Sequence, residues 1–170
     1  MPQPLSRADA WNLLSEWVTS PGLRRHCLAV EASMRFAARR LGADEELWAV
    51  TGLLHDADYE RHPDMDDEAA GHPRTIMAEL RARDADPAIV EAIAGHAPYL
   101  GVARESDMAK WLFAVDELSG FVLAVAYVRP EGIHGMTPKS VKKKLKQPSF
   151  AAAVSREDVQ GGAGEVGLEF

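Results

Sequence analysis

Residues 45–56 read Glu-Glu-Leu-Trp-Ala-Val-Thr-Gly-Leu-Leu-His-Asp, and this stretch decides the fold that the sequence predicts. Its apolar residues recur at intervals of three and four, which places them on one face of an α-helix. Asp44, directly before the stretch, is a favourable N-terminal cap. His55 continues the apolar face and Asp56 follows it. The end of this predicted helix therefore offers an imidazole and a carboxylate side by side.

The same helical spacing recurs along the rest of the chain, and no stretch alternates for long as a strand would. Serine, proline and glycine residues divide the apolar segments at positions typical of helix starts and ends. Further helices are predicted after Ser6 and over about residues 23–41, 73–83, 87–96 and 106–127, with another beginning at Thr137-Pro138. Residues 58–71 are acidic and contain a proline, so we expect an exposed loop there. The sequence predicts an all-α fold, a single bundle of about six to eight helices.

The length of 170 residues suits one domain, and neither an internal repeat nor a low-complexity linker divides the chain. We expect a domain over residues 1–154, with a helical core over 22–130 and a basic helical appendage over 131–154. Residues 155–170 are predicted to be a C-terminal tail.

Composition narrows the possible partners. Hydrophobic residues make up 46% of the chain and charged residues 26%, which is typical of a globular protein in water. The formal net charge of −7 argues against a nucleic-acid polymer as the main partner, but it permits a small phosphorylated substrate. Cys27 is the sole cysteine, which favours a reducing cytoplasm. The polar start from Met1 to Leu5 predicts no leader, and no apolar run predicts a membrane span. The sequence does not indicate an oligomeric state.

Three polar residues lie on predicted core-facing helical stripes. His26 shares its stripe with Val30, and His96 extends the stripe that contains Ile93. Each histidine alone is more simply explained as a buried, hydrogen-bonded side chain. Asp116 favours a different interpretation, because a carboxylate on a buried stripe is costly unless a cation or hydrogen-bond donors meet it. Inward-facing histidines and carboxylates on several helices are typical of metal sites in helical bundles.

In this order, His26, the His55-Asp56 pair and Asp116 resemble the HD superfamily of metal-dependent phosphohydrolases. The resemblance extends over about residues 22–130 and implies the helical HD fold.

His72 and His96 lie between the pair and the last aspartate, where the two-metal branch of this superfamily has its additional histidines. The segments 116–120 and 140–144 also resemble a bacterial subgroup of HD proteins that are described only as predicted hydrolases.

The resemblance implies a site for one or two divalent ions, and its donor set suits Mn, Fe, Co, Ni or Zn. A hydroxide activated by the metal would then attack the phosphorus of a phosphomonoester or phosphodiester, possibly a nucleotide. Asp56 would bridge two ions, and Asp58 could orient a ligand or donate a proton to the leaving group. The expected metal ligands are His26, His55, Asp56, His72, His96 and Asp116, and the expected catalytic residues are Asp56 and Asp58.

Four basic residues could bind the substrate phosphate. Arg25 adjoins His26, Arg61 follows the pair, and Arg74 follows His72. Lys142 belongs to a basic cluster that could fold over the site. The simpler alternative for all four is a solvated surface side chain.

Two other functions remain open. The oxygenase branch, similar to inositol oxygenase, uses the same ligands around two iron ions. In that enzyme a lysine shortly after the pair helps bind substrate, whereas residues 57–60 here contain none. The other alternative is a binding module without catalysis, in which the metal is structural and the basic cluster contacts a partner.

Overall fold

The computed structural model describes residues 4–170, so most of the polar start, and the first three residues of the predicted 1–154 domain, lie outside it. Residues 4–170 form eight α-helices and one short 3-10 helix, with no strand, which confirms the predicted all-α fold. The elements are α1 (Arg7–Trp17), α2 (Pro21–Leu41), α3 (Glu45–Leu54), α4 (Arg74–Ala82), α5 (Pro87–His96), η1 (Pro98–Leu100), α6 (Asp107–Tyr127), α7 (Pro138–Leu145) and α8 (Arg156–Glu165).

Local signals in the sequence set most helix bounds. Six of the described α-helices follow a serine or aspartate whose side chain accepts a hydrogen bond from a backbone N–H of the first turn, and this interaction satisfies a donor that the helix itself cannot. The capping residues are Ser6, Ser20, Asp44, Asp86, Ser106 and Ser155. At the other end of α2, Gly42 adopts a left-handed conformation with a φ of 66° and stops the helix.

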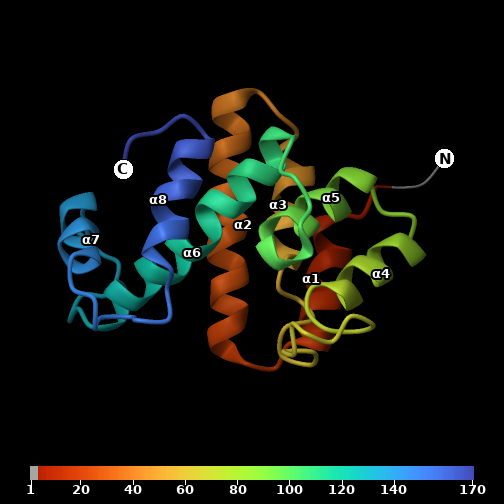
Figure 1. Cartoon of the computed structure of the whole chain (residues 1–170), viewed down its shortest axis with the longest axis horizontal. Coiled ribbons are helices and arrows are strands. Elements are labelled where there is room, and N and C mark those ends of the chain that lie inside the picture. Colours follow the sequence, from red (N-terminus) through yellow and green to blue (C-terminus); the bar gives the residue numbers. More distant parts are fainter. Residues whose placement is uncertain (1–3) are drawn as a thin grey trace.

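Helix α2 runs through the middle of the molecule and packs against α3 and α6, while α5 packs against α6 (Figure 1). Gly52 lets α3 approach α2 closely, because a Cβ atom there would lie only 3.0 Å from the backbone oxygen of Val30. Leu53, Ile93 and Leu112, from α3, α5 and α6, are fully or almost fully buried in the shared core. These helices carry His26, His96 and Asp116, and the His55-Asp56 pair directly follows α3.

The C-terminal stretch differs from the prediction of a tail over residues 155–170. Helix α8 occupies most of it and packs against α6, with Val159 and Gly162 buried. A Cβ atom on Gly162 would lie 2.7 Å from the Cα atom of Ala114, so glycine is what permits this close contact. Arg104 adds an ion pair to Glu165, 2.5 Å between nitrogen and oxygen. The helix therefore belongs to the packed part of the molecule, although its three glycines disfavour helix in isolation.

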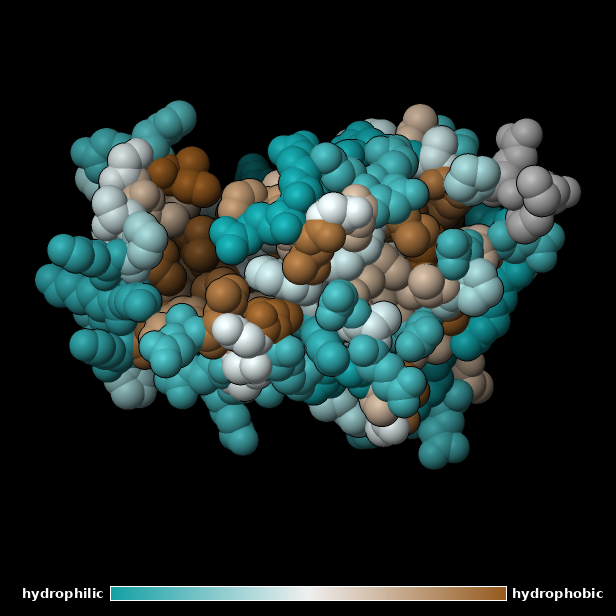
Figure 2. Space-filling model, turned by 90° about the horizontal axis from the view of Figure 1, so that it is seen from above, coloured by the Kyte–Doolittle hydropathy of each residue, from teal (hydrophilic) through white to brown (hydrophobic). Residues whose placement is uncertain are grey.

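Helix α7 lies at the same end as α8, and its Val141 packs with Phe121 and Val125 of α6 in a second, smaller core. Side chains of α6, α7, α8 and the chain end surround an apolar cavity of about 520 Å³. Figure 2 shows hydrophobic side chains gathered in a hollow at this end of the molecule. Among residues 4–170, no helix combines the length and apolar character needed to cross a membrane.

Candidate metal centre

The fold brings together six side chains that are far apart in the sequence. His26 lies in the first half of α2, and Asp116 lies in the middle of α6. His55 and Asp56 come directly after the last residue of α3. His72 precedes α4 by two residues, and His96 is the last residue of α5. All six residues predicted as metal ligands therefore meet in one place.

Four of these residues form a first group around His26. Its Nε2 atom lies 3.2 Å from the Nε2 atom of His55 and 3.0 Å from Oδ1 of Asp116. Asp56 approaches both imidazoles with its Oδ2 atom, at 3.5 Å from each Nε2. One ligand atom from each of the four residues lies within 4.8 Å of the others, which is compact enough to surround a single metal ion.

A second group shares Asp56 with the first. The other oxygen of Asp56, Oδ1, lies 3.2 Å from Nε2 of His72 and 3.5 Å from Nε2 of His96. The two oxygens of one carboxylate thus face two different sets of imidazoles. This is the arrangement expected of a carboxylate that bridges two ions.

Hydrogen bonds fix the protonation of three imidazoles. Nδ1 of His55 lies 2.7 Å from the backbone oxygen of Gly52, and Nδ1 of His96 contacts the backbone oxygen of Ile93. Nδ1 of His72 lies 2.7 Å from Oδ1 of Asp58. Carbonyl and carboxylate oxygens only accept, so each Nδ1 must carry the proton and donate it. In the neutral ring, each Nε2 then presents a lone pair to the centre of the site.

Lone pairs on nitrogen face carboxylate oxygens throughout this cluster, and such an arrangement is repulsive without a cation or a proton between the atoms. Burial alone would lower the pKa of His55, but Asp56 and Asp116 outweigh it and raise that pKa to about 9. Burial alone would raise the pKa of the two carboxyl groups, yet the neighbouring imidazoles lower it below its ordinary range. The donor set is therefore built to receive positive charge.

Asp58 supports the second group without reaching the pocket. It belongs to a segment predicted to be an exposed loop, but its side chain is fully buried. One oxygen accepts the Nδ1–H of His72, and the other accepts the backbone N–H of Ile76 at 2.9 Å. Both oxygens are engaged in these hydrogen bonds and Asp58 does not line the pocket, so its contacts are those of a residue that orients His72, and either role stays a prediction. The sequence predicted an exposed loop here because it does not show that the side chain of Asp58 is buried.

A pocket of about 490 Å³ opens onto the cluster. Five of the six candidate ligands line it, His55 being the exception, and the remaining wall contains aromatic, apolar and acidic side chains that were not predicted as binding residues. Tyr99 donates its hydroxyl hydrogen to the backbone oxygen of His72 at 2.7 Å, and the ring of Tyr59 stands edge-on to His72. The other wall residues are Met65, Ala97, Pro98, Phe113, Glu117, Gly120, Ala153, Val154 and Asp158.

None of the four basic residues predicted to bind phosphate lines this pocket. Arg25 is exposed on α2, while Arg61 donates to the backbone oxygen of Glu16 at 2.7 Å, away from the cluster. Arg74 donates to the backbone oxygen of Met65 at 3.1 Å. Lys142 lies over the ring of Phe170 near the chain end. Each of these side chains has a local partner or faces solvent outside the pocket, and phosphate binding by them stays a prediction.

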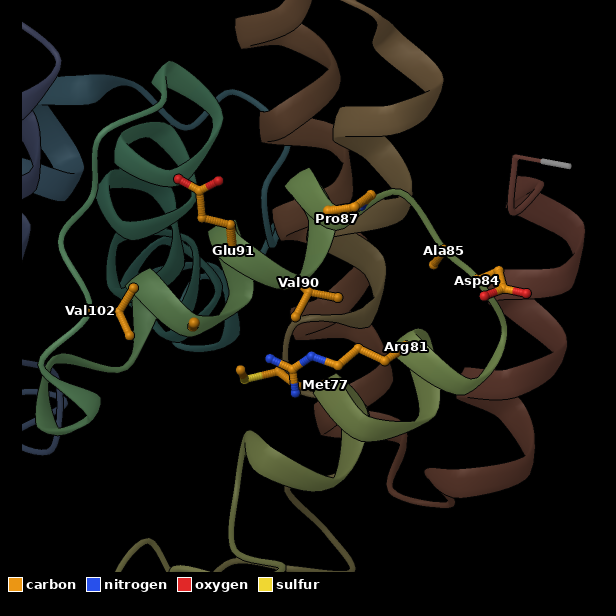
Figure 3. A pocket seen from close by; sticks show the side chains of 9 residues that line it. Met77, Arg81, Asp84, Ala85, Pro87, Val90, Glu91 and Val102 are labelled. Atoms are coloured by element: carbon orange, nitrogen blue, oxygen red, sulfur yellow. The ribbon is translucent and has the colours of Figure 1, made fainter. Parts of the chain in front are cut away.

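A pocket of about 1140 Å³ lies between α4 and α5, and the side chain of Arg81 is directed toward Met77 and Val90 there (Figure 3). None of the six clustered side chains lines it. Its walls offer an open apolar surface with scattered charges and lack a convergent set of polar groups. The chemistry of the chain is therefore concentrated at the histidine and aspartate cluster.

Comparison with known proteins supports this assignment. A family model described as HD domain matches residues 23–119, which is more than half of the chain and includes all six clustered residues. Neither the curated proteins nor the solved structures contain a match.

Proposed function

The chain belongs to the HD domain family, and on this basis we propose that it is a metal-dependent phosphohydrolase that cleaves a small phosphomonoester or phosphodiester. The observation that carries the proposal is the position of Asp56, whose two oxygens face two separate groups of imidazoles. In this proposal His26, His55, Asp56 and Asp116 hold one divalent ion, and Asp56, His72 and His96 hold a second.

The donor chemistry fits such ions. Nitrogen donors from imidazole combined with carboxylate oxygens suit Mn, Fe, Co, Ni or Zn. Three of the four imidazoles direct Nε2 at the site, because their Nδ1–H groups are already donated elsewhere, and Nε2 is the atom that can bind a metal ion once the ring is neutral. Divalent ions bound there supply activation of water at neutral pH and neutralise charge on the phosphoryl oxygens.

The residues of the chain contribute orientation and a confined reaction space. Asp58 and the carbonyls of Gly52 and Ile93 hold three imidazoles in a fixed orientation. In the reaction, the oxygen of a water molecule bonds to phosphorus as the ester P–O bond breaks. The two protons of that water end on the phosphate and on the released alcohol. Among residues 4–170, no serine or cysteine lines the pocket as an alternative nucleophile.

A panel of phosphate esters tests this proposal. The purified chain is loaded with Mn²⁺, and release of inorganic phosphate or of the alcohol is measured for each ester. We expect metal-dependent turnover of at least one ester, with loss of turnover in His55→Ala and Asp56→Ala while circular dichroism retains the helical signal. His134→Ala is the matched control, because this exposed histidine lies outside the cluster.

No turnover of any ester by the metal-loaded protein would contradict the proposal. A strict requirement for iron, together with consumption of dioxygen, would favour the oxygenase alternative instead.

A further inference from the structure

The charges around the pocket are unusual for a site that takes a phosphorylated substrate. Beyond the candidate metal ligands, the charged residues of its wall are Glu117 and Asp158, and within the described part of the chain no lysine or arginine accompanies them. Arg74 acts on Tyr99 from outside the lining, so no side chain that lines the pocket supplies a cation, and the metal ions would have to bind the phosphate directly. The two additional carboxylates would repel a second anionic group of the substrate.

Glu117 of α6 and Asp158 of α8 line the same pocket and are close enough to act on each other electrostatically. Glu117 follows Asp116 in α6, and its Oε2 atom accepts the backbone N–H of Ser155 at 3.0 Å. Asp158 lies in the first turn of α8, which begins after Ser155. The N-terminus of a helix stabilises carboxylates, but it carries only about half an elementary charge. Arg104 also acts on Asp158, but its charge is balanced by its ion pair with Glu165. This end of α8 therefore leaves most of the negative charge of the pair uncompensated.

The charge balance of the whole pocket indicates what could compensate the negative charge of Glu117 and Asp158. Two divalent ions would exceed the charge of Asp56 and Asp116 by two, which matches the two negative charges of a phosphomonoester. Glu117 and Asp158 then remain as a separate acidic wall on the side of α8. The aromatic wall made by Tyr59 and Tyr99 adjoins His72, and both rings are partly exposed, by 39% and 46%. Such rings also favour a cation over an anion.

We propose that the substrate is a phosphate ester whose organic part carries an ammonium group, with the phosphate at the metal centre and the ammonium group at Glu117 and Asp158. This inference rests on the proposed function for the phosphate half of the substrate. In this assignment the two carboxylates determine specificity. The aromatic wall encloses the organic part of the substrate between its phosphate and its ammonium group.

Two esters of equal length test the inference. 2-Aminoethyl phosphate carries the ammonium group, and propyl phosphate replaces it with an uncharged methyl group. Binding of each ester to the Mn²⁺-loaded chain is measured by titration calorimetry, and hydrolysis is measured in parallel. We expect the aminoethyl ester to bind about tenfold more tightly and to have the higher kcat/KM. Glu117→Gln and Asp158→Asn should each reduce this preference severalfold, mainly by raising KM for the aminoethyl ester.

Glu157→Gln is the matched control, since this exposed residue precedes Asp158 in the same helical turn and does not line the pocket. It should leave the preference unchanged. If Glu117→Gln disturbs the contact with Ser155, Asp158→Asn still tests the ammonium site. Equal binding of the two esters, or tighter binding of propyl phosphate, overturns the inference even if both are hydrolysed. Preferential binding without hydrolysis would support the ammonium site and would count against the phosphohydrolase proposal alone.

Discussion

Replacing Asp58 with asparagine tests how the second half of the metal centre is held in place. The carboxylate is fully buried, with one oxygen 2.7 Å from Nδ1 of His72 and the other 2.9 Å from the backbone nitrogen of Ile76. Asparagine has nearly the same shape but a single acceptor oxygen, so its amide group must face one of these two donors. A buried donor left without an acceptor costs about 1–3 kcal/mol, and we expect the free energy of unfolding of the metal-free chain to fall by that amount.

The effect on metal binding should be selective. Carboxylates that orient a metal-binding histidine typically account for about 10–100-fold in metal affinity. Titration of Asp58→Asn with Mn²⁺ should therefore show one weakened step and one nearly unchanged step, because Asp58 contacts His72 and not His26 or His55. Asp66→Asn is the control, since it removes the same charge from an exposed position in the following loop. Equal weakening of both steps, or no weakening at all, would refute the orienting role.

Three further predictions concern the bridging carboxylate, pH and the packing of α8. Asp56→Ala should abolish binding of both ions and reduce turnover by more than about 100-fold, as measured by elemental analysis and phosphate release on the same samples. Asp56 and Asp116 outweigh burial and raise the pKa of His55 in the folded chain to about 9. Protonated His55 therefore stabilises the metal-free chain fully below its ordinary pKa of 6.5, and this stability is lost as pH rises to about 9. Over the same range the affinity for Mn²⁺ should rise, since the metal displaces that proton. Urea unfolding at several pH values checks the stability, and calorimetry checks the metal affinity. A flat pH profile would contradict these predictions. Gly162→Ala should lower the free energy of unfolding by about 1–3 kcal/mol, because its Cβ would meet Ala114. Gly161→Ala, whose Cβ would have nothing within 4 Å, should raise it by about 0.5–1 kcal/mol. Equal effects of the two substitutions in denaturant unfolding would argue against the α6–α8 contact.

Helix bounds were predictable wherever capping residues and apolar spacing agreed. Pro87 to His96 is a helix in both the prediction and the structure, because Asp86 caps it and Pro87 suits its first turn. Helix α8 was missed because Gly161 and Gly162 suggest a loop, although Ser155 with two acidic residues after it is a start signal. The helix depends on contact with α6, and a tertiary contact of this kind is not visible in local sequence.

The six clustered residues were predicted as ligands from the resemblance of their order to the HD superfamily, and the structure brings them together. Their roles as ligands stay a prediction until metal is measured. The remaining wall of the pocket was not predictable in the same way. Tyr99 and Asp158 come from separate segments that only the packing of α5, α6 and α8 brings to one pocket. The four basic residues do not line the pocket, because adjacency to a ligand in sequence does not determine which way a long side chain points.

Metal stoichiometry tests the central claim most directly. The purified chain, freed of metal and reloaded with Mn²⁺, is analysed for metal per chain by mass spectrometry after exhaustive dialysis, alongside Asp56→Ala and His134→Ala. The account predicts two ions per chain for the wild type and for His134→Ala, and none retained by Asp56→Ala. Equal metal content in the wild type and Asp56→Ala, or none in the reloaded wild type, would contradict it.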